Sequence, residues 1–169
     1  MRRIVLAVAL ASGLGVDAAW AWSATVDGPD VFGVTKVIAT EGSGREGIVV
    51  QCDSKDQLHI ATIFRKKEFE DIPEFPATLL IKVGEAEPFK LGATLRTWND
   101  NYGGIVVSGR TPELVAVVKA ISTAKSKINV GYEIGGEQFS ATFGARGSTS
   151  AMQKAINGCK LTDIELPSD

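Results

Sequence analysis

The sequence predicts an α+β fold that is mainly antiparallel β and sandwich-like, with about eight strands and two short helices packed on the sheet. Short runs of β-branched and alternating apolar residues recur along the chain, separated by segments rich in Gly, Asp, Asn and Pro. This is the pattern of strands and turns. Only two segments have helical spacing, and both come late. Strand and helix therefore do not alternate as they do in a parallel sheet.

The composition of the 169 residues is that of an ordinary globular protein. The 18 Lys and Arg residues are balanced by 20 Asp and Glu residues, so the net charge is −2. This does not supply the clustered basic surface that nucleic-acid binding needs. Two Cys and one His are too few for a structural zinc site of four ligands. We expect no metal, no other cofactor and no nucleic-acid partner.

The first 21 residues have the parts of a bacterial Sec-type signal peptide. Arg2 and Arg3 form a positive start, residues 4–16 form an apolar stretch, and Ala19-Trp20-Ala21 fits the pattern that signal peptidase recognises. The apolar stretch has 13 residues and a membrane span needs about 20, so we do not expect a retained anchor. We predict cleavage after Ala21, a periplasmic or secreted location, and no membrane span in the mature chain. That chain would carry a net charge of −3.

Export changes how the two cysteines are interpreted. In an oxidising compartment, two Cys more often form a disulfide than remain free thiols. Cys52 ends an apolar run, and Cys159 lies 107 positions later on the apolar stripe of a helical segment. We predict a bond between them that clasps residues 22–169 into a single β-rich domain. In the chain-entropy model, such a bond stabilises the fold by up to about 4.7 kcal/mol.

The early strands are expected to form hairpins. Residues 22–33, which contain Gly28-Pro29, are expected to form an irregular lead-in or an edge strand. The Gly-rich segment 41–47 is predicted to be a flexible loop. A four-residue turn, 53–56, would set Cys52 opposite Gln57. The other strands are predicted at 34–39, 48–52, 57–65, 77–83, 89–97 and 104–109.

The clearest hairpin is predicted at residues 127–143. Apolar residues alternate on both sides of Gly135-Gly136, and glycine adopts the positive φ of a two-residue turn without steric cost. Pairing Ile134 with Glu137 sets Tyr132 opposite Phe139. The same register gives apolar partners along the whole inner face, which makes it self-consistent.

Two helices complete the predicted fold. Thr111-Pro112-Glu113 has the order of an N-cap, a first-turn proline and a first-turn acid, and an apolar segment follows to Ile121. Its wide apolar arc indicates packing flat on a sheet. The second helix is expected from about Ser150 to Gly158, with Ser148 or Ser150 as its N-cap.

No set of residues forms a recognisable catalytic or metal site. The predicted register brings Cys52 and His59 onto one face as a potential nucleophile–base pair, but a bond to Cys159 would remove the thiol. We favour His59 as a half-buried strand residue. Asn99-Asp100-Asn101 slightly resembles a calcium loop, yet it lacks the fifth-position ligand and the bidentate Glu at the twelfth position. We predict no catalytic residues and no metal ligands.

The candidate partner-binding surface is the turn after the Trp-containing strand. Aromatic residues stand at both ends of this turn, with turn-forming polar residues between them. Trp98 at the strand end can be a contact residue or a lid on the core, and the sequence leaves both alternatives open. The predicted surface consists of Trp98, Asn99, Asp100, Asn101 and Tyr102.

The mature chain resembles a group of small bacterial periplasmic proteins associated with secretion, in particular the type VI secretion-associated periplasmic family. The shared features are a Trp near the mature start, an early strand ending in Cys, a Trp at a later strand end, an apolar helix, a hairpin, and a final helix ending in Cys. The resemblance implies a role beside a secretion system and no catalytic residues. The matching positions are Trp22, Cys52, Trp98, Leu114–Ile121, residues 130–147 and Ala151–Cys159.

These observations predict a non-enzymatic periplasmic accessory or binding protein that acts through protein–protein contacts, with a protein partner in the cell envelope. The alternative is a secreted inhibitor of a hydrolase such as a protease or lysozyme. In that case the loop at 41–47 or at 99–104 would enter the enzyme's cleft. A third hypothesis is a thiol enzyme or small hydrolase that uses His59.

Overall fold

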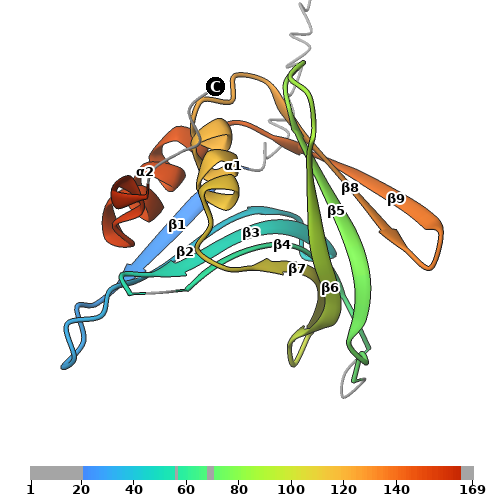
Figure 1. The fold of residues 1–169 in the computed structure, drawn as a ribbon, viewed down its shortest axis with the longest axis horizontal. Helices are drawn as coiled ribbons and strands as arrows, with labels where there is room; N and C mark the ends of the chain where they lie inside the picture. Colours follow the sequence, from blue (N-terminus) through green and yellow to red (C-terminus); the bar gives the residue numbers. More distant parts are fainter. Residues whose placement is uncertain (1–20, 56, 68–70, 165–169) are drawn as a thin grey trace, which may run out of the picture.

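The computed structural model describes residues 21–55, 57–67 and 71–164, so the predicted signal peptide lies outside the described residues except for Ala21. It confirms the predicted α+β class with mainly antiparallel strands. Within the described residues, nine strands form one sheet, rather than the two sheets of a sandwich, and two helices pack on it (Figure 1). The strands are β1 Ser23–Asp27, β2 Lys36–Gly42, β3 Glu46–Asp53, β4 Leu58–Arg65, β5 Phe75–Val83, β6 Phe89–Asn99, β7 Tyr102–Ser108, β8 Lys127–Ile134 and β9 Glu137–Gly144. The helices are α1 Pro112–Ser122 and α2 Ser148–Gly158, followed by a 3-10 turn, η1 Leu161–Asp163.

The sheet is antiparallel throughout, in the order β1-β2-β3-β4-β7-β6-β5-β8-β9. Most neighbours are consecutive in the chain; the exceptions are β4 beside β7 and β5 beside β8. Figure 1 shows both helices on one side of the curved sheet, with the β8–β9 hairpin extending away from them. No helix of the described chain is long and apolar enough to cross a membrane.

The core lies between the helices and one face of the sheet, which we call the inner face. Alternate residues of each strand point to this face, as the two-residue period of a strand requires. Burying these apolar side chains supplies the main favourable term in folding. Fully buried examples are Val37, Val50, Ile60, Leu79, Ile81 and Ile128 on the sheet, Val117, Val118 and Ile121 on α1, and Met152 and Ala155 on α2.

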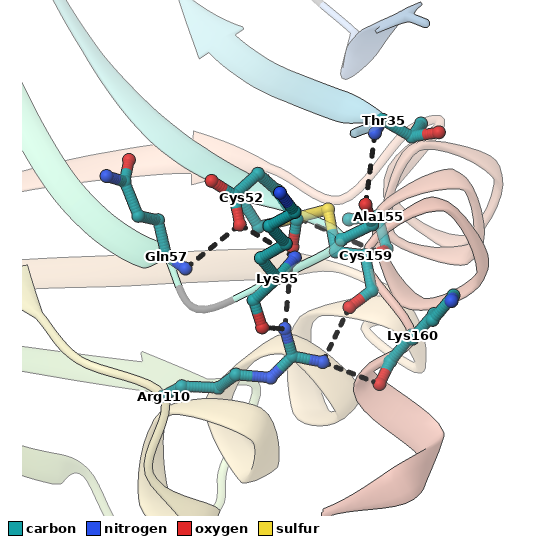
Figure 2. The surroundings of a disulfide bond; sticks show 10 residues. Thr35, Cys52, Lys55, Gln57, Arg110, Ala155, Cys159 and Lys160 are labelled. Atoms are coloured by element: carbon teal, nitrogen blue, oxygen red, sulfur yellow. Dashed lines mark hydrogen bonds between the residues drawn. A yellow bond between two sulfur atoms is a disulfide. The ribbon is translucent and has the colours of Figure 1, made fainter. Parts of the chain in front are cut away.

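The predicted disulfide between Cys52 and Cys159 is present, with a Cα–Cα distance of 6.0 Å. It joins the end of β3 to the residue after α2. Beside it, the Arg110 guanidinium donates from Nη1 to the carbonyl of Lys55, and from Nη2 to those of Cys159 (2.7 Å) and Lys160 (2.8 Å) (Figure 2). A cation at the carbonyl end of a helix is favourable because the helix dipole is negative there. The disulfide and Arg110 thus clasp α2 to the β3–β4 turn.

The first and last parts of the sheet meet at one corner. The backbone N–H of Trp22 donates to the carbonyl of Arg146 (2.8 Å), and its indole N–H donates to the carbonyl of Gly144 (2.9 Å). The Glu41 carboxylate accepts the N–H of Gly144 (3.2 Å). These bonds connect the start of β1 and the end of β2 to the end of β9, so the sheet nearly closes on itself there.

Two local predictions are confirmed in detail. The β8–β9 hairpin has the predicted register, with Ile134 opposite Glu137 and Tyr132 opposite Phe139. The rings of Tyr132 and Phe139 stack with centroids 5.0 Å apart. At α1, the Thr111 side chain accepts the N–H of Leu114, as an N-cap does.

The predicted cap of the second helix is wrong. The residue before α2 is Gly147 in a left-handed conformation (φ 81°), and no side chain caps the helix. Ser148 is fully buried instead. A Cβ on residue 147 would lie 2.8 Å from the carbonyl oxygen of Trp22. Only glycine fits at position 147, because the backbone is left-handed there and lies close to Trp22. A serine therefore cannot occupy the N-cap position.

The predicted β3–β4 register is also wrong, by one position. Asp53 pairs with Gln57 through the backbone, and its carboxylate accepts the N–H groups of Lys55 and Gln57. Residues 54–56 therefore separate the paired Asp53 and Gln57, and Cys52 faces Leu58 rather than Gln57. The predicted loop at 41–47 is shorter than expected as well, because β2 continues to Gly42 and β3 begins at Glu46.

We predict that Glu41→Gln stabilises the protein at neutral pH. Glu41 is 5% exposed, and its Oε2 has no hydrogen-bond partner among the described residues. Burial raises the pKa of Glu41 above its ordinary value of 4.5. The stabilisation linked to its protonation is complete below about pH 4.5 and is lost as the pH rises through the folded pKa. An amide stays neutral and keeps an oxygen for Gly144.

Thermal unfolding between about pH 4 and pH 8 checks this prediction. The Tm of the variant should exceed that of the natural protein at neutral pH by a few degrees, since 1 kcal/mol shifts the Tm of a domain of this size by about 2–4 °C. The difference should shrink toward acid pH. Glu46→Gln, at an exposed acid on β3, is the matched control. A variant that is less stable than the natural protein at every pH would contradict the prediction.

Candidate functional site

A hollow of about 510 Å³ lies on the outer face of the sheet, the face away from the helices. Ile38, Gln51 and His59 line it as neighbouring cross-strand partners on β2, β3 and β4. Residues near the end of β6, including Arg96 and Trp98, form its other side. The hollow therefore combines an aliphatic side chain, an amide, an imidazole, an indole and a guanidinium.

His59 is held in place by neighbours on both sides. Its Nδ1 lies 2.8 Å from the Ser108 hydroxyl, and the Trp98 ring meets its ring edge-on, with centroids 6.5 Å apart. Burial lowers the pKa of His59, and the Arg96 charge lowers it further, while Asp53 acts in the opposite direction. This environment favours the neutral form of His59, and Arg96 supplies a fixed positive charge to the hollow.

Arg96 is the charged residue in the lining, which contains no Asp or Glu among the described residues. Among the described residues, the Arg96 side chain forms no hydrogen bond or ion pair. A guanidinium presents planar donors that match a carboxylate, and it also stacks well on aromatic rings. The hollow can therefore receive a group that carries both an apolar part and a negative charge.

The five residues of the predicted binding surface have different structural roles. Trp98 and Asn99 line the hollow, and Asp100 and Asn101 form the exposed turn beyond it. The Asn99 side chain accepts the N–H groups of Asn101 and Tyr102 (both 3.0 Å), so it shapes the turn. Trp98 is half-buried on the outer face and does not belong to the main core. Trp98 is therefore not a lid on the main core but a wall of the hollow.

Ile38, Gln51 and Arg96 line the hollow but are not among the residues predicted from the sequence. Ile38 and Gln51 carry a usable signal, because correct strand alternation puts both on the face of His59. Arg96 carries none. Its strand, β6, is separated from β4 by β7 in the sheet, and that order arises from pairing between distant segments.

The structure overturns the hypothesis of a Cys52–His59 pair. Cys52 points to the inner face and is bonded to Cys159, while His59 points to the outer face. The predicted register was wrong by one residue, and a shift of one position moves a strand residue to the opposite face. The two side chains were therefore predicted on one face although they lie on opposite faces. The described residues also contain no group of three His, Cys, Asp or Glu side chains that could hold a metal ion.

Comparison with known proteins does not identify this arrangement. No protein-family model, no curated protein and no solved structure matches the chain. What the protein does must therefore be inferred from the chemistry of its own residues. The features that bear on it are the disulfide, the hollow and the edges of the sheet.

We predict that Arg96→Gln raises the pKa of His59. The natural protein should show a histidine pKa below 6.5, and removal of the nearby positive charge should bring it closer to that value. An NMR titration is unambiguous because His59 is the only histidine in the chain. Lys90→Gln, at an exposed cation on the same strand, should leave the pKa unchanged. If Arg96→Gln lowers the pKa or leaves it where it was, Arg96 does not act on His59.

Proposed function

We propose that this protein is an exported, non-enzymatic accessory or binding protein that acts through protein–protein contacts in the bacterial cell envelope. The observation that carries the proposal is the hollow at Trp98, where a half-buried indole stands beside a guanidinium that forms no ion pair with any described residue. Such a surface suits recognition of a side chain.

The disulfide and the N-terminal segment support the proposed compartment. Disulfides form and persist in the periplasm and outside the cell, and they are rare in reducing cytosol. Cys52 and Cys159 are both buried, and their bond joins the ends of β3 and α2. Residues 1–21 have the pattern of a signal peptide. The resemblance to secretion-associated periplasmic proteins favours a partner in an envelope or secretion assembly.

The binding surface is placed on the outer face because that face is accessible. Ile38 is 44% exposed, and Trp98 stands half-buried across the hollow from it. Trp and Arg are the residue types most enriched among those that dominate interface energies. We infer that an apolar side chain of the partner packs on Trp98 and Ile38. A carboxylate beside it would pair with Arg96.

We predict that Trp98→Ala abolishes capture of the envelope partner. Loss of a dominant interface residue costs about 2 kcal/mol or more, which is at least a thirtyfold loss of affinity. The tagged, exported protein is cross-linked in native cell envelopes, and its partner is identified by mass spectrometry. Phe32→Ala is the matched control, since Phe32 is an aromatic residue 78% exposed on another surface. Undiminished capture by a folded Trp98→Ala protein would reject the hollow as the binding surface.

A secreted inhibitor is a second candidate, favoured by one observation. The two segments proposed for insertion into an enzyme lie side by side, because the Tyr102 hydroxyl donates to the carbonyl of Gly44 (3.2 Å). Their tips, Ser43–Arg45 and Asp100-Asn101, are exposed. Paired loops held by a rigid sheet are a common way to present a binding surface.

Assays against a panel of proteases and lysozymes test this candidate. As an inhibitor, the natural protein should block one enzyme at a near-stoichiometric ratio. Tyr102→Phe should weaken the block by about fivefold, the effect of losing a hydrogen bond of about 1 kcal/mol that holds the loops. Trp98→Ala should leave inhibition intact, which separates this function from the first. No inhibition across the panel would exclude the candidate for those enzymes.

A further inference from the structure

The two edge strands of the sheet, β1 and β9, differ in how well they are covered. β1 has five residues, α2 packs beside it, and the Lys154 ammonium donates to the carbonyl of Ala24 (3.3 Å). β9 has eight residues and forms the outer strand of the β8–β9 hairpin (Figure 1). An uncovered edge presents a row of unpaired N–H and C=O groups that can template another strand.

The hydrogen bonds around β9 show which of its residues face outward. Ala145, just after the strand, donates its N–H to Ser126 on the β8 side. Gly144 uses its N–H and carbonyl on the other side, with Glu41 and Trp22. Because the backbone direction alternates along an antiparallel strand, Gln138, Ser140 and Thr142 must face the same open side as Gly144. Their backbone groups bond to no other described residue.

Protective features that natural edge strands carry are missing from β9. Proline, lysine and bulges usually prevent an edge from pairing with another chain. Residues 138–144 contain no proline and no charged residue, and β9 pairs with β8 through all eight positions without a shift in register. Phe139 on its inner face is 44% exposed. The strand therefore combines free backbone groups with an uncovered aromatic ring.

We propose that β9 pairs antiparallel with β9 of a second copy of this chain, about a two-fold axis at Ser140. In this register Ser140 faces its own counterpart, and Gln138 faces Thr142 of the second copy. Each of these pairs forms two hydrogen bonds, so all the outward backbone groups of Gln138, Ser140 and Thr142 in both copies are satisfied. On the inner side, Phe139 lies over Ala141 of the second copy, which shields the exposed ring from water.

The second copy is favoured over an unrelated strand because β9 is complementary to itself. A two-fold interface requires that one patch match itself in reverse order. Here the amide of Gln138 meets the hydroxyl of Thr142, a large aromatic side chain meets alanine, and no like charges face each other over residues 138–142. This surface is separate from the hollow at Trp98, so dimerisation and partner capture can fail independently.

Light scattering and sedimentation of the mature, disulfide-bonded protein test the proposal. The natural protein should change from monomer to dimer with concentration between about 1 and about 200 µM. Ser140→Pro should stay monomeric with an unchanged circular dichroism spectrum, because the folded monomer does not use the N–H that proline removes. Ser140→Lys, which sets two lysines face to face across the axis, gives the same readout if the proline variant fails to fold. Thr25→Lys, on β1, is the matched control and should dimerise normally.

A thiol-specific cross-linker tests the register itself. Ser140→Cys should be linked into dimers through a short cross-linker, and Thr25→Cys should not. A natural protein that stays monomeric over the whole concentration range would overturn the proposal. A dimer that persists in folded Ser140→Pro and Ser140→Lys proteins would overturn it as well, and would place the interface elsewhere.

Discussion

The covalent clasp between Cys52 and Cys159 holds α2 against the inner face of the sheet, and the rest of the architecture depends on this attachment. α2 ends where Gly158 approaches Val37 so closely that a Cβ would lie 2.7 Å from the valine methyl. Arg110 then binds the carbonyls that follow the helix and the β3–β4 turn (Figure 2). With the inner face covered in this way, the outer face stays available for contacts.

The alternation of residues along β3 and β4 separates stability from recognition. Val50, Cys52 and Ile60 face the helices, while Gln51 and His59 face the hollow. A substitution on one set therefore acts mainly on folding, and a substitution on the other acts mainly on the surface. The turn after Asp53 sets this assignment, because a shift of one position in β4 would move His59 to the face of Val50.

The corner at Trp22 determines which part of the β9 edge is covered. It joins β9 to the start of β1 and the end of β2 through a side-chain oxygen of Glu41 that accepts the Gly144 N–H, and it requires the left-handed Gly147. The edge of β9 beyond this corner remains open. A binding surface at Trp98 and a pairing edge on β9 would together let a dimer present two copies of one recognition site.

Local chemistry in the sequence was sufficient to predict the fold class, the disulfide, the cap at Thr111 and the full register of the β8–β9 hairpin. Each of these depends on residues close in the chain or on the pairing of two unique cysteines. The β3–β4 register was predicted wrongly although its contacts are local, because turn composition alone did not indicate that the Asp53 carboxylate accepts the N–H groups of Lys55 and Gln57. The cap of α2 and the grouping of Arg96 with His59 were decided only in the tertiary structure. The reason is that the passage of Gly147 beside Trp22 and the insertion of β7 between β4 and β6 both involve contacts between residues far apart in the chain.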